Sequence, residues 1–332
     1  MHPFSYHAAT SLDDAARRLA APGAVPLGGG TDLLVAVKEG IVAPEALVDL
    51  RRAGAESAEI RELADGALRI GAAARVGDVA ASPLVRERFP ALADAAAAVA
   101  TYALRAMGTI GGNLCQRPRC WYFRRGIPCL KNGRGDDCPA RDGENQYHAI
   151  LAGGPCWIVH PSDTAVALTA LDATVEIAGA GGRRRVAIAD FYVLPSERLD
   201  QETVLGAGEF VSAVEIPAAA AGGVQHYYKV MQRGAWDFAL VSLAAVRRAA
   251  GDGEVRLVLG GVAPRPYRLY GSIEEDVAVG NLDEADVETL AARALYDAEP
   301  LTRNGYKVEV AASLLRRAMR ELWRADAPGA PR

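Results

Sequence analysis

The stretch Ala-Val-Pro-Leu-Gly-Gly-Gly-Thr-Asp at residues 24–32 decides how the first part of this chain folds. Its apolar beginning, Ala24–Leu27, predicts a short strand, and a helix is expected to begin near Leu33. Glycines at such a junction let the backbone approach a phosphate, and the free N–H groups at a helix start favour an anion. The hydroxyl of Thr31 could add a donor. Because the GxGxxG spacing is absent, a plain tight turn explains the triple glycine equally well.

The residues around this stretch complete a predicted βαβ unit at residues 1–53. Ser11 and Asp14 form a capping box that opens a short helix, and Ala46–Leu50 is expected to form another strand. Residues 51–66 are polar and rich in alanine and glycine. This composition indicates a boundary between the first unit and the next.

Two further segments are expected, at residues 54–220 and 221–332. In the former we expect alanine-rich helices up to Arg105, a helix at Asp163–Leu171, and strands at Ala67–Gly71, Thr174–Ala178 and Gly206–Pro217. In the latter we expect strands at His226–Gln232, Phe238–Arg247 and Glu254–Val262, a hairpin at Gly251-Asp-Gly, and helices at Asp283–Tyr296 and Tyr306–Trp323. The pattern predicts an α+β protein in three parts.

A second glycine loop, Gly108-Thr-Ile-Gly-Gly-Asn113, follows the alanine-rich helices. One such loop is enough for a mononucleotide. Two loops, each with a hydroxyl residue, suit a pyrophosphate that bridges the two halves of a larger cofactor. The alternative is that these glycines end a helix and form a turn.

Bulk composition excludes several classes of protein. The formal net charge of −4 argues against a nucleic-acid-binding protein, which usually shows a basic excess. The N-terminus lacks the basic and apolar regions of a secretory signal, and no apolar stretch is long enough to span a bilayer. We therefore expect a cytoplasmic chain that is not a membrane protein. It could still reach the periplasm attached to a partner that carries an export signal.

All five cysteines lie in one window of 42 residues, at Cys115, Cys120, Cys129, Cys138 and Cys156. Disulfide scaffolds belong to small secreted domains, so the group indicates a metal site. Thiolates hold either tetrahedral zinc or an iron–sulfur cluster. Because no CxxC pair is present, the wide spacing favours a cluster over zinc.

The same stretch is rich in basic residues, namely Arg117, Arg119, Arg124, Arg125, Lys131 and Arg134, against only Asp136 and Asp137. Nearby cations stabilise a thiolate-ligated cluster, which is anionic. The alternatives are a solvated basic loop or a surface for an acidic partner.

Taken together, these motifs resemble those of the FAD-binding subunits of molybdenum hydroxylases. That family includes the flavoprotein subunits of xanthine dehydrogenase, carbon monoxide dehydrogenase and aldehyde oxidoreductases. The resemblance runs in order through both glycine loops, His160-Pro-Ser-Asp-Thr-Ala165, Tyr228-Lys229, Arg233–Ser242, Gly260–Arg268 and Ala298–Lys307. It implies a two-part FAD-binding domain of the vanillyl-alcohol-oxidase (PCMH) type at residues 1–53 and 54–220. Residues 221–332 would form the carbon monoxide dehydrogenase flavoprotein-like C-terminal α/β domain.

The resemblance also implies roles for particular residues. The cofactor-binding set would be Leu27, Gly28, Gly29, Gly30, Thr31, Asp32, Thr109, Gly111, Gly112, Asn113, Asp163 and Lys229. The two loops would hold the pyrophosphate. Asp163 would contact the adenine-side ribose or the polar chain of the cofactor, and Lys229 would lie near the isoalloxazine. Without the family, Asp163 is a helix N-cap and Lys229 a solvated strand lysine.

Almost fifty residues separate Asn113 from Ser162. This insertion, at about residues 115–157, resembles one in the flavoprotein subunits of hydroxybenzoyl-coenzyme A reductase and of a periplasmic aldehyde oxidoreductase. The second match is closer, through Gln116–Arg124, Pro128-Cys129, Gly143-Glu-Asn and His148–Leu151. It implies a 4Fe-4S cluster on Cys120, Cys129, Cys138 and Cys156. Cys115 is not part of this ligand set, and we interpret it as a small core residue near the flavin.

These observations favour an electron-transfer subunit of an oxidoreductase. The resemblance implies two partners in a heterotrimer: a large molybdopterin-binding subunit that carries the substrate chemistry, and a small subunit with two 2Fe-2S clusters. Electrons would pass from the small subunit to the FAD of this chain. The alternatives are a hydroxybenzoyl-coenzyme A reductase-like subunit, or a zinc-loop binding module without flavin. The substrate and the electron acceptor are left open.

Overall fold

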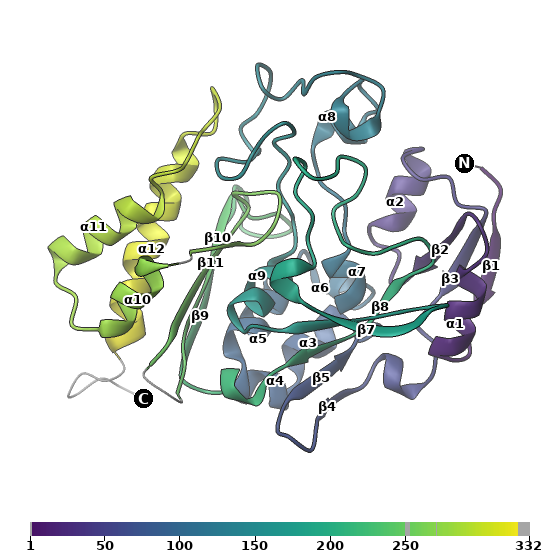
Figure 1. Ribbon diagram of the computed structural model, residues 1–332, viewed down its shortest axis with the longest axis horizontal. Helices are drawn as coiled ribbons and strands as arrows, with labels where there is room; N and C mark the ends of the chain where they lie inside the picture. The colour runs from purple at the N-terminus through teal and green to yellow at the C-terminus, as the bar shows by residue number, and fades with distance from the viewer. Residues whose placement is uncertain (1, 250–252, 270, 325–332) are drawn as a thin grey trace.

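The computed structural model of this protein describes residues 2–249, 253–269 and 271–324. Three β-sheets and the helices around them make up the chain, so the α+β class is confirmed. In Figure 1 the N-terminal sheet lies at one end of the molecule and the C-terminal helices at the other. The predicted hairpin at Gly251-Asp-Gly falls mostly on residues 250–252, outside the described residues.

The first sheet is parallel, with the strand order β1-β3-β2. It consists of β1 (Ser5–Ala8), β2 (Ala24–Leu27) and β3 (Ala46–Asp49), joined by α1 (Leu12–Leu19) and α2 (Leu33–Lys38). The hydroxyl of Ser11 accepts a hydrogen bond from the backbone N–H of Asp14, which is the N-cap half of the predicted capping box. The other half does not form, because the Asp14 carboxylate accepts from the N–H of Thr10. Because the strands are parallel, the glycine loop after β2 lies at the same sheet edge as the end of β3.

The second sheet is antiparallel, with the order β4-β5-β8-β6-β7. Its strands are β4 (Ile60–Glu62), β5 (Leu68–Gly71), β6 (Thr174–Gly179), β7 (Gly182–Ala187) and β8 (Phe210–Ile216). Arg69 is buried within it and donates to the carboxylates of Glu176 and Glu215. β4 falls in residues 51–66, which therefore contain a strand as well as the polar connection that composition predicts.

Helices pack against one face of this sheet and supply most of the central core. They are α3 (Val76–Ala81), α4 (Pro83–Arg88), α5 (Pro90–Ala97), α7 (Ile110–Leu114) and α9 (Asp163–Ala170). The short α6 (Tyr102–Arg105) lies beside α3 and has no buried residue. Every residue of α9 is buried, because it packs between α5 and the third sheet. Short 3-10 helices lie at Ala55–Ser57, Leu130–Asn132, Ile188–Asp190 and Ala218–Ala220.

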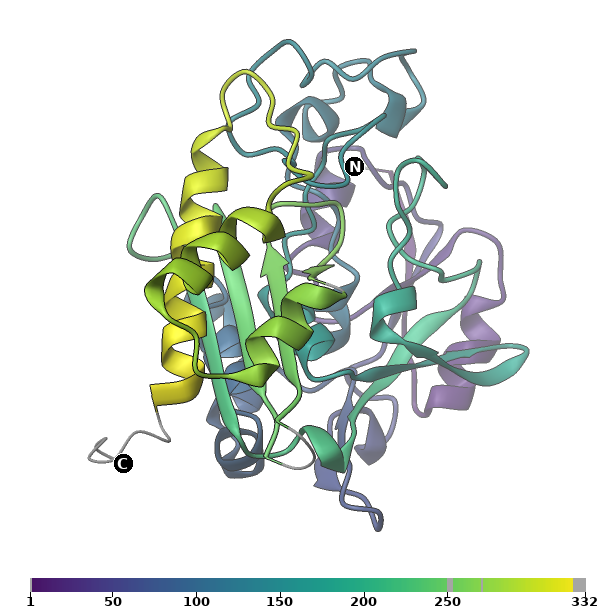
Figure 2. The same ribbon diagram turned by 60° about the vertical axis from the view of Figure 1, so that its left-hand side comes forward.

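The third sheet is antiparallel and contains β9 (Val224–Val230), β10 (Val241–Arg247), β11 (Val255–Gly260) and β12 (Tyr267–Arg268). One face packs on α5 and α9. Figure 2 shows the other face covered by α10 (Ser272–Val279), α11 (Glu284–Ala294) and α12 (Tyr306–Arg324). The two predicted C-terminal helices are confirmed as α11 and α12, whereas α10 and β12 were not predicted.

The cysteine-rich insertion connects α7 to α9 and rises above the rest of the molecule in Figure 1. Its regular structure is limited to α8 (Trp121–Arg124) and the 3-10 helix Leu130–Asn132. The remainder is irregular backbone that depends on side-chain contacts for its shape. Across the described ranges of the chain, no helix is long and apolar enough to cross a membrane.

Candidate functional site

The two glycine loops contact each other directly. A Cβ atom on Gly29 would lie 1.8 Å from the carbonyl oxygen of Met107, and one on Gly28 would lie 2.5 Å from Oγ1 of Thr109. Real Cβ atoms do not approach other atoms so closely, so glycine is required for the loops to pack together. The close approach therefore explains both glycines without reference to a ligand.

The two loops line the same cavity, which has a volume of about 600 Å³. Of the residues predicted to bind a cofactor, Gly28, Gly29, Gly30, Thr31, Asp32, Thr109, Gly112, Asn113 and Asp163 line it. Within the described part of the chain, the backbone N–H groups of residues 29–31 donate no hydrogen bond. These donors are the groups that a phosphate would use.

Leu27 and Gly111 do not line this cavity. Leu27 is buried at the end of β2, and a Cβ on Gly111 would lie 2.8 Å from the Cβ of Ala72. Gly111 thus lets α7 pack closely against the end of β5. Both residues therefore lie behind the wall of the cavity and pack against the residues that form it.

A hydrogen-bonded junction ties the second glycine loop to the start of α9. The side-chain oxygen of Asn113 accepts from the hydroxyls of Ser162 at 2.6 Å and Thr164 at 2.7 Å. The Ser162 hydroxyl also accepts from the N–H of Ala165, so Ser162 is the N-cap of α9. Asp163 is the first helical residue, which corrects the expectation that it is the cap.

Asp163 forms a buried ion pair with Lys229. Nζ of Lys229 lies 2.8 Å from Oδ2 of Asp163 and donates a second hydrogen bond, 2.9 Å long, to the carbonyl of Ala98. The Tyr227 hydroxyl donates to Oδ1 of Asp163 at 2.6 Å. Burial raises the pKa of Asp163, although the Lys229 charge opposes that shift. Lys229 is therefore not a solvated strand lysine, and it lines neither the cavity at the glycine loops nor its neighbour.

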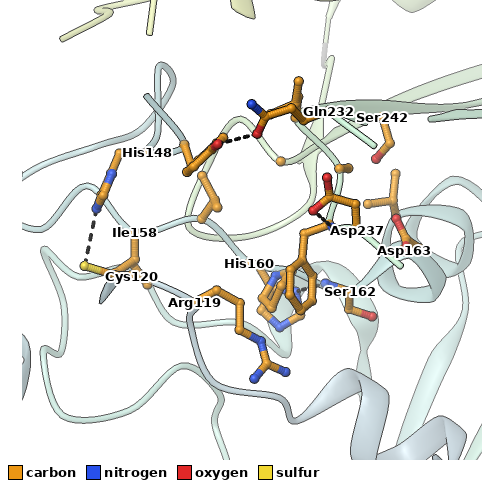
Figure 3. A pocket seen from close by; sticks show the side chains of 18 of the residues that line it. Arg119, Cys120, His148, Ile158, His160, Ser162, Asp163, Gln232, Asp237 and Ser242 are labelled. Carbon is orange, nitrogen blue, oxygen red and sulfur yellow. Dashed lines mark hydrogen bonds between the residues drawn. The ribbon is translucent and has the colours of Figure 1, made fainter. Parts of the chain in front are cut away.

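A smaller neighbouring cavity of about 390 Å³ lies between the insertion, the start of α9 and the third sheet (Figure 3). Asp163, Pro161, Arg119, Asp237 and Phe238 line both cavities. The Arg119 guanidinium lies over the ring of Phe238, 4.9 Å from its centroid. These shared residues lie where the cavity at the glycine loops meets the smaller one, a place here called the passage. The wall of the smaller cavity also contains Cys120.

Asp32 binds the insertion to the first glycine loop. Its carboxylate accepts from the Arg119 guanidinium at 2.5 Å, the Arg124 guanidinium at 2.8 Å and the Arg117 backbone N–H at 2.8 Å. Burial alone would raise the pKa of Asp32, but the two guanidinium groups outweigh burial and hold it below its usual value. Its carboxylate therefore anchors the insertion while the residue lines the cavity.

Glu202 is a second anchor for the insertion. It accepts from Nε of Arg117 at 3.0 Å and forms an ion pair with the buried Lys131 at 2.6 Å. Arg117, Arg119, Arg124 and Lys131 are thus paired with carboxylates outside the insertion. The interpretation of the whole stretch as a solvated basic loop is therefore wrong for these four residues.

The four cysteines predicted as ligands lie close enough to affect one another's pKa. Cys129, Cys138 and Cys156 are buried, and Cys120 is partly buried. Burial raises the pKa of Cys120 to about 11, and the nearby Cys138 and Cys129 act in the same direction. Cys138 and Cys156 share a hydrogen bond, which lowers the pKa of the former and raises that of the latter.

Cys115 is separate from this group. It lines the cavity at the glycine loops, and burial raises its pKa to about 12. Among the described residues, no group of three or more histidine, cysteine, aspartate or glutamate side chains is arranged to hold a metal ion as the side chains stand. The four thiols are neighbours, but their geometry does not itself define an ion site.

Several residues of the site had no role assigned from the sequence. His148 and Lys307 belong to motifs of the resemblance, and the structure joins them: Nζ of Lys307 donates to the His148 carbonyl at 3.0 Å. Asn304 donates to the same carbonyl at 3.1 Å. These partners are more than 150 residues apart, so no local pattern could reveal the contacts.

Comparisons with known proteins identify the family to which this chain is similar. The family described as the FAD binding domain in molybdopterin dehydrogenase matches residues 2–219, and the carbon monoxide dehydrogenase flavoprotein C-terminal domain matches residues 226–322. The aldehyde oxidoreductase FAD-binding subunit PaoB of Escherichia coli K12 is 38% identical over 303 residues, which span 90% of this chain and 92% of that protein. The carbon monoxide dehydrogenase medium chain of Hydrogenophaga pseudoflava is 29% identical and covers 96% of this chain and 97% of its own.

Solved structures show the same architecture. A carbon monoxide dehydrogenase from Hydrogenophaga pseudoflava superposes with a TM-score of 0.74 at 27% identity, covering 97% of this chain and 98% of its own. Quinoline 2-oxidoreductase from Pseudomonas putida 86 gives a TM-score of 0.73 at 27% identity, with 98% and 100% covered. The fold is thus that of an FAD-binding flavoprotein. The chain belongs to the FAD-binding medium subunits of the molybdenum hydroxylases.

Proposed function

We propose that this chain is the electron-transfer subunit of an aldehyde-oxidising molybdenum hydroxylase and carries both FAD and a 4Fe-4S cluster. The observation that carries the proposal is the position of Cys120. It lines the smaller cavity, which adjoins the cavity at the glycine loops. A cluster on the insertion would therefore border the flavin.

The cavity at the glycine loops suits the adenine dinucleotide part of FAD. Its wall offers the unpaired N–H groups of residues 29–31 and the hydroxyl of Thr31, which are donors to a pyrophosphate. The smaller cavity is lined mainly by apolar and aromatic groups and suits the isoalloxazine ring. In this arrangement, residues 1–53 and 54–220 hold the dinucleotide. Residues 221–332 enclose the isoalloxazine end of the cofactor.

Lys229 then acts through Asp163 and does not contact the ring. Its ammonium opposes the effect of burial on the Asp163 carboxyl group, and Asp163 lines both cavities where they meet. A carboxylate there can accept hydrogen bonds from hydroxyls of the ribose or the polar chain. The proposed role of Asp163 is to fix the middle of the cofactor at the passage.

The insertion suits a cluster with four thiolate ligands. Cys129, Cys138 and Cys156 are buried. The hydrogen bond with Cys138 and burial raise the pKa of Cys156, and the charge of Lys131 opposes part of that rise. A buried cation next to thiols favours the ionised sulfur that binds iron. When bound, the flavin exchanges electrons in pairs or singly and the cluster exchanges them singly. The protein holds the two groups side by side and excludes water from the thiols.

The relatives support the choice of partners and substrate. PaoB is named as an aldehyde oxidoreductase FAD-binding subunit, and the carbon monoxide dehydrogenase relatives are named as medium chains. We propose that a molybdopterin-binding large subunit oxidises the aldehyde, and that a small subunit with two 2Fe-2S clusters delivers the electrons to this chain.

Purification of the complex through a tag on this chain tests the proposal. We expect two further subunits to co-purify and the flavin absorbance to bleach under anaerobic conditions when an aromatic aldehyde is added. Re-oxidation of the chemically reduced flavin by an aromatic coenzyme A thioester, with no bleaching by the aldehyde, would contradict it. A colourless chain without partners would also contradict it.

A further inference from the structure

His148 lies between the proposed cluster ligands and the smaller cavity. Its Nε2 is 3.3 Å from the sulfur of Cys120, the contact drawn in Figure 3. The imidazole is buried and packs edge-on against Trp121, with the ring centroids 6.0 Å apart. The same imidazole lines the smaller cavity. His148 is therefore in contact with one proposed ligand and borders the space proposed for the flavin.

The hydrogen-bond partners of the ring identify the nitrogen that carries the proton. Nδ1 of His148 is buried and has no hydrogen-bond partner within the described residues. A proton on Nδ1 would therefore be a buried donor without an acceptor, which is costly. In the neutral ring the proton is best placed on Nε2, where the Cys120 sulfur accepts it.

The C-terminal segment fixes the backbone that carries this ring. Nζ of the buried Lys307 donates to the carbonyls of Tyr147, His148 and Gly261 at 2.9, 3.0 and 2.7 Å. Asn304 donates to the carbonyls of His148 and Ala149, both at 3.1 Å. No carboxylate forms an ion pair with Lys307 in the described chain, so three backbone carbonyls are the partners that hold its Nζ.

We propose that His148 is a positioning residue that raises the reduction potential of the cluster by donating its Nε2–H to the sulfur of Cys120. Lys307 holds the backbone of His148 in that orientation. A hydrogen bond to a ligating sulfur stabilises the more negative, reduced state of a cluster. This inference rests on the proposed function, because the acceptor is a cluster ligand.

The experiment is a redox titration of the cluster, followed by electron paramagnetic resonance, in the complete complex. In His148→Leu the midpoint potential should become more negative while the iron content stays at the wild-type level. His148→Gln, which keeps an N–H donor, should recover part of the shift. Lys307→Met should shift the potential in the same direction as His148→Leu. His226→Leu is the matched control, because His226 lies on β9 and lines neither of the two cavities.

The outcomes separate this inference from the proposed function. An unchanged potential in His148→Leu with full iron content overturns the hydrogen-bond role. Loss of iron in both His148→Leu and His148→Gln also overturns it, because it would make His148 a ligand. A wild-type complex that contains flavin but no iron instead overturns the cluster itself.

Discussion

The Lys229 ammonium lies 2.8 Å from the Asp163 carboxylate, and their side chains are only 4% and 6% exposed. Lys229 is on β9 of the C-terminal part, and Asp163 is the first residue of α9 in the FAD-binding part. The pair therefore joins the two parts of the chain at the passage between the cavities. Lys229 was predicted to lie near the flavin, and we propose that it acts on the flavin indirectly, through Asp163.

Removing this lysine should destabilise the protein strongly. Lys229→Met leaves the buried Asp163 without its counter-ion, and we expect the free energy of unfolding of the full chain to fall by about 3–5 kcal/mol. Urea denaturation measures the change. The double variant Lys229→Met/Asp163→Asn should recover much of the loss. The exposed Lys38→Met should have little effect, and an equal loss there would contradict this account.

The contact between the glycine loops makes a second prediction. Gly29→Ala places a methyl group against the Met107 carbonyl, so the loops must separate. We expect a loss of about 1–3 kcal/mol in stability and a protein depleted of flavin. Gly181→Ala is the control, because a Cβ there meets no atom within 4 Å. The account fails if Gly29→Ala retains stoichiometric flavin at wild-type stability.

Asp32 should couple the glycine loop to the insertion. In Asp32→Asn the Arg119 and Arg124 guanidinium groups lose their anionic partner, at a cost of about 1–3 kcal/mol. We expect iron and flavin contents to fall together in this variant, as measured by metal analysis and absorbance. Asp136→Asn, an exposed change within the insertion, should keep both. Full iron content in Asp32→Asn would argue against the coupling.

Lys307 should give the stability of the protein a distinctive pH dependence. Burial lowers its pKa to about 7, whereas an unfolded lysine titrates near about 10.4. Between these values the unfolded chain binds a proton that the folded chain lacks, so this group makes stability rise with pH. The wild type should therefore gain stability relative to Lys307→Met between pH 7 and pH 10, at up to about 1.4 kcal/mol per pH unit. Denaturation at several pH values measures the difference, and a constant difference would contradict the shifted pKa.

Local patterns predicted the glycine loops, α9 and the C-terminal helices, because each depends on residues close together in sequence. β7 was not predicted, since three of its residues are arginines. It forms an edge strand whose charges pair outward, as Arg184 does with Glu209 at 2.7 Å. Composition alone gives such a segment the appearance of a polar loop.

The resemblance predicted the cofactor residues as a set, but the sequence does not show their individual partners. The pairing of Asp32 with Arg119 and Arg124 spans 87 and 92 residues, so the sequence shows only charges that need partners. The insertion illustrates the same limit. Its basic residues were interpreted as cations that stabilise a cluster, with a solvated loop or a docking surface as the alternatives. The fold brings carboxylates from two other segments to Arg117, Arg119 and Arg124.

The iron and flavin content of the purified protein tests the central claim most directly. We predict one flavin per chain with about four iron atoms and about four acid-labile sulfides. Cys129→Ser should lose the iron, while Cys115→Ser, whose sulfur lies apart from the other four, should retain it. Zinc in place of iron, or equal iron loss from Cys115→Ser and Cys129→Ser, would contradict the account.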